Sequence, residues 1–252
     1  ADQTMRKVSS VRSPFAKKLL RLADHYEPWR IWSDFITMFA IAISNQVDSE
    51  ESEQWESREE MYQKISGRYT AEEMTAFADL TADVATALAV NPDQDFLGDA
   101  YMELGLNNHW TGQFFTPYNI CKLMTLTSAV EEIERKGYIS LCDPACGAGA
   151  TLIAGVNVIA GELVRNRPEL RWQDHVVVAA QDIEYIVGLM CYIQLSLIGC
   201  AGFVKIGDSI ADPMHFGDDM AKYWILPAHH KEIRRQLELD NAEAEEQQRK
   251  VG

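Results

Sequence analysis

The stretch Asp143-Pro144-Ala145-Cys146-Gly147-Ala148-Gly149-Ala150-Thr151-Leu152 decides the fold of this chain. An apolar run, Tyr138–Cys142, precedes it, and residues 153–160 continue it with small and apolar side chains. This order predicts a strand, a turn of small residues with an acid at its start, and a helix. Gly147 and Gly149 let a ligand approach the backbone, and the helix start offers unpaired N–H groups. The acid disfavours a phosphate-rich ligand, because a carboxylate repels phosphate and attracts an amine.

Two further β-prone runs follow, and each leads into an acidic residue. Val176–Ala180 is a continuous apolar run, typical of a buried parallel strand, and Gln181-Asp182-Ile183-Glu184 follows it. Phe203–Ile206 is shorter and leads into Gly207-Asp208-Ser209. A single acid at a strand end is as readily a solvated loop carboxylate as a functional one. Acids that close three successive strands together indicate a functional site.

A second motif, Gly112-Gln113-Phe114-Phe115-Thr116-Pro117, lies upstream of the first predicted strand. Together with the Asp143–Leu152 loop, it resembles the S-adenosylmethionine-dependent N6-adenine DNA methyltransferases. The resemblance is specifically to the modification subunits of type I restriction-modification systems, and it covers roughly residues 105–210. It implies an α/β fold with a Rossmann-like class I methyltransferase core, and S-adenosylmethionine as the cofactor.

The resemblance also implies a role for each motif residue. Thr116 would help to hold the methionine carboxylate, and the Asp143–Gly149 loop would wrap the methionine amino end. Asp182 would accept hydrogen bonds from both ribose hydroxyls, with Ile183 packing on the adenine face, and Asp208 would accept from the adenine amino group. The cofactor-binding residues expected on this basis are Gln113, Phe115, Thr116, Pro117, Asp143, Pro144, Ala145, Cys146, Gly147, Gly149, Thr151, Leu152, Asp182, Ile183, Asp208 and Ser209.

The acceptor motif of the resembled family, Asn/Asp-Pro-Pro followed by an aromatic residue, is absent. Asp212-Pro213-Met214-His215 keeps one acid and one proline without a stacking ring, and it follows Asp208 too closely for an intervening strand. Tyr223–Pro227 reads as a strand ending in proline. There Leu226 stands where the polar residue belongs, and leucine cannot accept a hydrogen bond from an amine. The catalytic residues therefore stay unassigned.

The first hundred residues are expected to form a helical unit of their own. Phe15–Tyr26 has helical spacing, and Pro28 begins a helix whose aromatic residues recur every three or four positions. That spacing favours core packing over a nucleic-acid platform. Thr70-Ala71-Glu72-Glu73 is a capping box that opens a third helix through about Leu88. Residues 48–60 hold seven acids and one arginine, which indicates a solvated loop or helix face.

These patterns divide the chain into four segments. Residues 1–12 are expected to be disordered, residues 13–104 to form a helical N-terminal domain, residues 105–228 to form the S-adenosylmethionine-binding domain, and residues 229–252 to be a charged helix or tail. The four expected strands make a short sheet for the resembled fold, and no β-prone run follows Pro227. We expect an altered loop or a second polypeptide to complete the acceptor site.

Charge and composition set further bounds. The net charge is -15 at pH 7, so the isolated chain is expected to bind duplex DNA weakly. In type I systems a separate specificity subunit grips DNA, so the resemblance implies DNA contact through a partner in an oligomer or hetero-complex. A mean hydropathy of -0.20, without an apolar run of membrane-spanning length, predicts a cytoplasmic protein with no membrane contact. The five cysteines are expected to be reduced, buried thiols, and no metal site is expected.

Three functions remain open from the sequence. The first is an adenine-N6 DNA methyltransferase, or the catalytic subunit of one, that works with a partner. The second is a cofactor-binding regulatory or structural subunit without methyl transfer. The third is methylation of a non-DNA acceptor, such as RNA, a protein or a small molecule.

Overall fold

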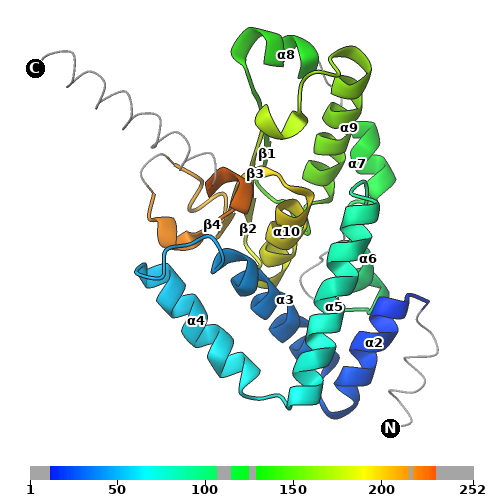
Figure 1. The fold of residues 1–252 in the computed structure, drawn as a ribbon, viewed down its shortest axis with the longest axis vertical. Helices are drawn as coiled ribbons and strands as arrows, with labels where there is room; N and C mark the ends of the chain where they lie inside the picture. The colour runs from blue at the N-terminus through cyan, green and yellow to red at the C-terminus, as the bar shows by residue number, and fades with distance from the viewer. Residues whose placement is uncertain (1–11, 107–114, 125–128, 216–217, 231–252) are drawn as a thin grey trace, which may run out of the picture.

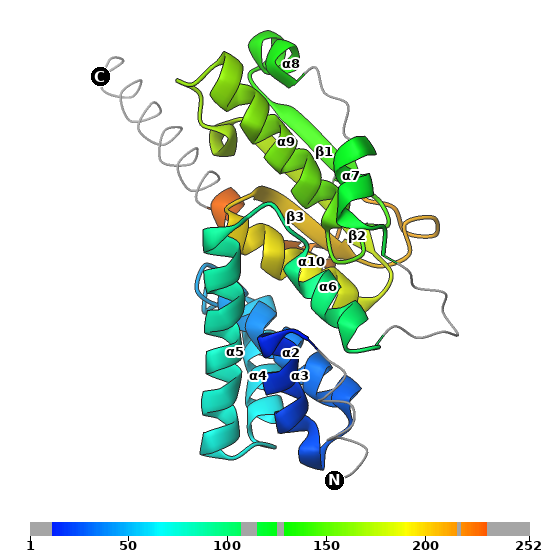
Figure 2. The same cartoon turned by 90° about the vertical axis from the view of Figure 1, so that its right-hand side faces the viewer.

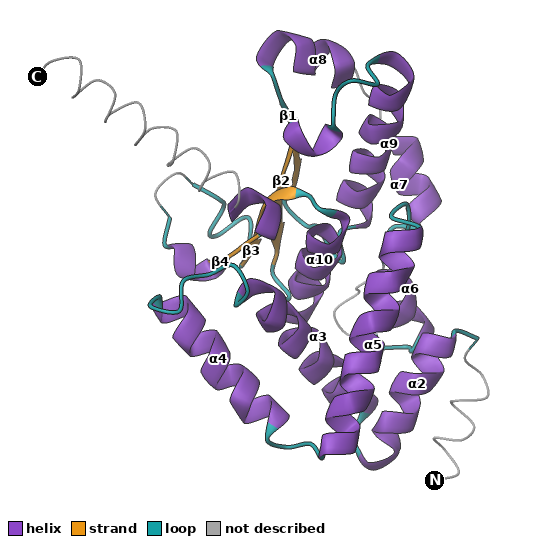
Figure 3. Cartoon of the chain, in the orientation of Figure 1, coloured by secondary structure: helices purple, strands orange, loops and turns teal. Residues whose placement is uncertain are grey.

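The fold is described by a computed structural model for residues 12–106, 115–124, 129–215 and 218–230. In these ranges helices predominate around a small sheet (Figure 3). The α-helices are α2 Pro14–Leu22, α3 Pro28–Ser44, α4 Glu53–Ser66, α5 Ala71–Val90, α6 Phe96–Glu103, α7 Tyr118–Met124, α8 Ala129–Lys136, α9 Ala150–Asn166 and α10 Tyr185–Ile198. The strands are β1 Ile139–Asp143, β2 Val176–Asp182, β3 Ala201–Ile206 and β4 Tyr223–Ile225.

The sheet has the strand order β1-β2-β3-β4. The first three strands are parallel neighbours, joined by the crossover helices α9 and α10 (Figure 1). This arrangement confirms the predicted Rossmann-like α/β core, because consecutive parallel strands need a helical crossover. β4 instead runs antiparallel to β3, with Lys205 opposite Tyr223 and Phe203 opposite Ile225.

One face of the sheet is covered by helices. α9 packs on β1, and α10 packs on β2 and β3. Val178, Ala180 and Val204 point to this side and have no exposed surface. Figure 2 shows α9 and α10 lying along the same side of the sheet. Alternate residues of the apolar run of β2, Val176, Val178 and Ala180, are thus buried under the helices, as predicted, whereas Val177 and Ala179 are half-buried on the other face.

The opposite face of the sheet is open at β1. Cys142, Ala179 and Phe203 are partners in register and share this face, since side chains in register on adjacent strands point the same way. Ser140 and Cys142 are exposed, and Ala179 and Phe203 are half-buried. The prediction that all five cysteines are buried is therefore wrong for Cys142, because strand alternation turns its side chain to the uncovered face. In the described part of the chain, no strand pairs with the outer edge of β1.

The helical N-terminal part shares one continuous apolar core with the sheet part. α3 lies against α10, and α5 also contacts α10 (Figure 1). Trp32, Phe35 and Ile36 of α3 are almost fully buried, which confirms that its aromatic spacing serves core packing, although Trp29 is 45% exposed. The boundary between the two predicted domains stays a prediction, but the core does not divide there.

The acidic segment at residues 48–60 is more ordered than its composition suggests. Ser52 caps α4 by accepting a hydrogen bond from the Trp55 N–H at 3.2 Å. Its one cation, Arg58, is mostly buried: it donates to Asp48 at 2.7 Å and to the Tyr223 carbonyl at 3.0 Å. The segment is thus a helix anchored on β4 by its arginine. The predicted capping box at residues 70–73 is confirmed, and the helix it opens, α5, continues to Val90.

Candidate functional site

Three acidic side chains lie along one edge of the sheet. Asp143 ends β1 and Asp182 ends β2, while Asp208 follows β3 by two residues. Because these strands are parallel neighbours, their carboxyl ends share an edge, which is where open α/β sheets bind ligands. The structure therefore brings together the three acids that the sequence singled out. Their individual roles stay predictions.

The glycine loop between β1 and α9 is held by its own backbone. The Cys146 N–H donates to the Gln181 carbonyl at 3.0 Å, and the Gly149 N–H donates to the Cys146 carbonyl at 2.8 Å. Gly149 is the N-cap of α9 with φ +97°, and a Cβ there would lie 2.9 Å from Sγ of Cys191. Only glycine combines this φ with that close approach to α10. The loop thus owes its shape to packing as well as to ligand access.

Asp182 organises the same loop. Its Oδ2 accepts from the Gly147 N–H at 2.8 Å, and its Oδ1 accepts from the Glu184 N–H at 2.9 Å. Burial raises the pKa of Asp182; the two backbone hydrogen bonds oppose this shift, and the nearby charge of Asp143 adds to it. Sequence reasoning assigned Asp182 to the ribose alone and missed its hold on the glycine loop. Each carboxylate oxygen accepts more than one hydrogen bond, so both tasks are compatible.

The upstream motif reaches this loop through Phe115. A Cβ added to Gly147 would lie 3.3 Å from the Phe115 ring, whose other neighbour is Tyr101 at 5.4 Å between centroids. The Thr116 carbonyl accepts from the Cys121 thiol at 3.6 Å, and that sulfur accepts from the Thr151 hydroxyl at 3.7 Å. The motif and the glycine loop are therefore neighbours in space.

The remaining predicted residues differ in what they offer a ligand. Pro144, Ala145, Thr116 and Pro117 are exposed, and Ser209 is half-buried. Cys146 and Leu152 are buried, so their side chains support the loop and only their backbone can face a ligand. Gln113 lies outside the described residues.

Only one carboxylate oxygen of Asp208 accepts hydrogen bonds from the described residues. Its Oδ1 accepts from the Ile210 N–H at 2.8 Å and the Ala211 N–H at 3.2 Å. In the described part of the chain, its Oδ2 has no hydrogen-bond partner, and the side chain is exposed. Ile183, the residue predicted to pack on adenine, is 64% exposed at the end of the neighbouring strand. The edge thus offers a free carboxylate oxygen and an exposed apolar side chain.

The charges of the edge favour a ligand rich in donors. Among the described residues, Asp143, Asp182 and Asp208 accept from backbone N–H groups, and none pairs with a lysine or arginine side chain. Unneutralised carboxylates attract cations and N–H or O–H donors. S-adenosylmethionine carries an ammonium, a sulfonium, two ribose hydroxyls and an adenine amino group. The carboxylate acceptors of this edge therefore fit the donor groups of that cofactor.

Neither segment considered for the acceptor motif is available for it. Both carboxylate oxygens of Asp212 are paired, Oδ1 with Lys205 at 3.0 Å and Oδ2 with Lys222 at 2.7 Å. Leu226 has no exposed surface, and it follows a strand antiparallel to β3. Its N–H donates to the Gly202 carbonyl near the start of β3, so it lies at the end of the sheet opposite the acidic edge. The comparison of Tyr223–Pro227 with the acceptor strand is therefore wrong.

Sequence reasoning missed a buried polar residue behind the loop. Gln194 of α10 donates to Asp95 Oδ1 and to the Ala148 carbonyl, both at 2.8 Å, and accepts from the Leu97 N–H at 3.0 Å. Gln194 has no exposed surface, and Asp95 is 4% exposed. Burial raises the pKa of Asp95, although the Gln194 hydrogen bond opposes the shift. A lone glutamine within an apolar helix was the sequence signal for this bridge between α6 and the glycine loop.

Two absences apply to the described ranges only. They contain no cluster of three or more side chains suited to hold a metal ion. They also contain no helix with the length and apolar character needed to cross a bilayer.

Comparison with known proteins identifies the family of the chain. A family model described as N-6 DNA Methylase matches residues 92–228, more than half of the chain. A crystal structure from Listeria monocytogenes, assigned to the class I S-adenosylmethionine-dependent methyltransferases, shares 14% identity with a TM-score of 0.41. That match covers 87% of this chain and 57% of the Listeria chain. No curated protein sequence matches.

Proposed function

Because the chain belongs to the N-6 DNA methylase family, whose cofactor is S-adenosylmethionine, we propose that it is the cofactor-binding part of an adenine-N6 DNA methyltransferase. In this role it would resemble the modification subunits of type I restriction-modification systems. The single observation that supports this proposal most is the row of unneutralised carboxylates at the carboxyl ends of β1, β2 and β3.

Each of the three acids would bind a different group of the cofactor. Asp143, at the mouth of the glycine loop, would face the methionine ammonium, and Asp182 would accept from the ribose hydroxyls while it keeps the loop closed. The free Oδ2 of Asp208 would accept from the adenine amino group, with Ile183 against the adenine ring. The bound cofactor supplies a methyl group on a positively charged sulfur. The protein then needs mainly to orient that group toward the acceptor amine.

A partner polypeptide would supply the acceptor side. The described residues leave the outer edge of β1 unpaired, and Ser140 and Cys142 leave its open face exposed. An unpaired strand edge presents N–H and C=O groups that another strand can pair with. A strand added there would end beside Asp143, next to the methyl donor. The net charge of -15 further favours DNA contact through a more basic partner.

The proposal is tested with unmethylated DNA and labelled S-adenosylmethionine, with the chain alone and with the products of neighbouring genes. We expect adenine-N6 label only in a combination that includes a partner, and its loss in Asp208→Ala. Asp174→Ala is the matched control, since Asp174 is an exposed aspartate in the short turn before β2, at the end of the sheet opposite the acidic edge. Label transfer that persists in Asp208→Ala would contradict the assignment of the site.

A second function is favoured by the engaged state of Asp212 and the buried Leu226. With both acceptor candidates committed to structure, the chain could serve as a regulatory or structural subunit that binds the cofactor without methyl transfer. Tight cofactor binding without label transfer in any combination would favour this second function. Label found in RNA, protein or small molecules would instead identify a non-DNA acceptor.

A further inference from the structure

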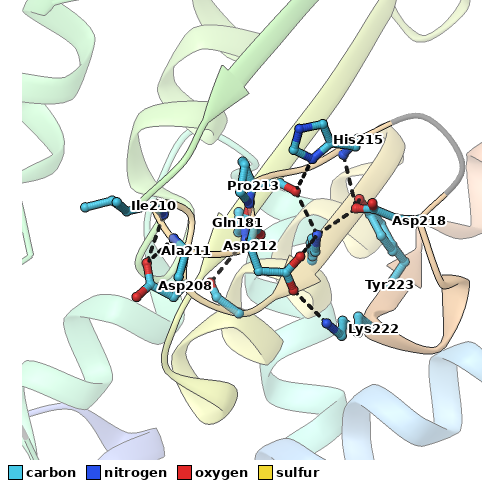
Figure 4. A network of polar contacts seen from close by, with 12 residues as sticks. Gln181, Asp208, Ile210, Ala211, Asp212, Pro213, His215, Asp218, Lys222 and Tyr223 are labelled. Carbon is cyan, nitrogen blue, oxygen red and sulfur yellow. Dashed lines mark hydrogen bonds and ion pairs between the residues drawn. The ribbon is translucent and has the colours of Figure 1, made fainter.

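Lys205 is a buried lysine at the edge of the site. It lies one residue before the end of β3, and its side chain has no exposed surface. Its ammonium donates to Asp212 Oδ1 at 3.0 Å, to the Pro213 carbonyl at 2.9 Å and to Asp218 Oδ2 at 2.6 Å (Figure 4). An ammonium has three N–H donors, so all of them are used.

Burying an ammonium group costs free energy, which suggests that Lys205 does more than stabilise the core. An isolated buried ammonium is strongly disfavoured, and a buried ion pair is often no more stabilising than a well-packed apolar side chain. All three oxygens that Lys205 binds belong to Asp212, Pro213 and Asp218, which follow β3. The ammonium thus ties these three residues to β3 more than it adds to the core. Burial by itself lowers the pKa of Lys205, but the hydrogen bonds to Asp218 and Asp212 outweigh it and leave the pKa raised, so the amine stays charged at neutral pH.

Asp212 holds Asp208 in turn. The Asp212 N–H donates to the Asp208 carbonyl at 2.7 Å. The Gln181 side chain donates to the Asp212 carbonyl at 2.8 Å and to the Gly207 carbonyl at 3.2 Å. Asp212 is therefore the junction: its side chain is held by Lys205, and its backbone closes the turn that orients Asp208. Figure 4 shows Asp208 at one end of this network and Asp218 at the other.

We propose that Lys205 is the positioning residue for recognition of the amino group on the cofactor's adenine, because it fixes the turn that aims Asp208 Oδ2. The inference rests on the proposed function, in which Asp208 accepts from that amino group. In this role Lys205 affects the selectivity of the site for the adenine base of the cofactor. A lysine that only joined β3 to β4 would affect the free energy of unfolding alone.

The test compares two ligands that differ only in the amino group: S-adenosylhomocysteine and its purine analogue, in which hydrogen replaces the 6-amino group. Dissociation constants are measured by calorimetry for each protein variant. A hydrogen bond to a charged acceptor gives the wild type a preference of about 10- to 150-fold for the amino ligand. In Lys205→Met we expect this ratio to fall toward one. In the matched control Lys222→Met the ratio stays at the wild-type value, because Lys222 binds the same Asp212 from a 51% exposed position.

The outcomes separate the two proposals. If the wild type binds both ligands equally, the role of Asp208 is wrong, and the inference fails with it. If the wild type selects and folded Lys205→Met selects equally well, only the Lys205 inference is overturned. Should Lys205→Met fail to fold, Asp212→Ala takes its place, since it keeps the backbone and removes the side-chain acceptor that Lys205 binds. An unchanged ratio in Asp212→Ala also overturns the inference.

Discussion

Replacing Asp182 by alanine tests the centre of the site. In the free protein this change removes the acceptors of the Gly147 and Glu184 N–H groups, which lie 2.8 and 2.9 Å from the carboxylate. Glu184 is exposed, so water replaces its lost partner, whereas the Gly147 N–H is half-buried. We therefore expect the free energy of unfolding to fall by about 1.5–3 kcal/mol, the value of one charge-assisted hydrogen bond.

The effect on the ligand is larger. If Asp182 accepts from both ribose hydroxyls, alanine removes two charge-assisted hydrogen bonds, and the affinity for S-adenosylhomocysteine falls by about 10²- to 10⁴-fold. Calorimetry measures this directly, with Asp174→Ala as a control at the opposite end of β2. Asp182→Asn keeps one neutral acceptor oxygen and is expected to lie between the wild type and alanine. An unchanged affinity in folded Asp182→Ala would refute the assignment of Asp182 to the ribose.

Three further predictions follow from the same contacts. Gln194→Leu leaves the Leu97 N–H and the Ala148 carbonyl without this side-chain partner, while Asp95 Oδ1 still accepts from the Gly98 N–H; we expect the free energy of unfolding to fall by about 2–6 kcal/mol in urea titration, and a loss under about 1 kcal/mol contradicts the bridge. Gly149→Ala combines a φ of +97° with overlap on a thiol and should cost about 2–4 kcal/mol, whereas Gly105→Ala, at φ +62° with open space, should cost only about 1–2 kcal/mol; equal losses in thermal unfolding would exclude the close packing. Because the pKa of Asp182 is raised, the folded chain binds that proton more tightly than the unfolded chain, so this group's contribution to the free energy of unfolding falls as pH rises through the raised pKa. If Asp182 binds the ribose as proposed, its ionised form is the better acceptor, so affinity should weaken as pH falls through the same range, and Asp182→Asn should lose both dependences.

The sequence could predict the strand ends because their signals are local. β2 is a continuous apolar run with an acid at its end, and the glycine loop follows β1 without interruption. A parallel βαβ unit then leaves little freedom, since the crossover is helical and the carboxyl ends must lie together. The capping box of α5 was readable for the same reason, because both of its hydrogen bonds lie within four residues.

The supporting contacts could not be predicted because their partners are distant in sequence or depend on tertiary packing. Gln194 and Asp95 are 99 residues apart, and Arg58 meets the Tyr223 carbonyl across 165 residues. No periodicity encodes such pairs. Lys205 is a different case: its carboxylate partners are close in sequence, but a lysine on a short strand gives no sign that Asp212, Pro213 and Asp218 fold back to bind it.

The direction of β4 in the sheet could not be predicted from the local sequence. Tyr223–Ile225 has the composition of a strand, and composition is the same whether the strand runs up or down the sheet. What decides is the path of the preceding residues, and Lys205 ties Asp212, Pro213 and Asp218 to β3. β4 pairs antiparallel with β3, at the opposite edge of the sheet from β1. The buried charge that we propose aims Asp208 at the cofactor thus also holds the described residues between β3 and β4 away from β1, where the described residues leave an edge for a partner strand.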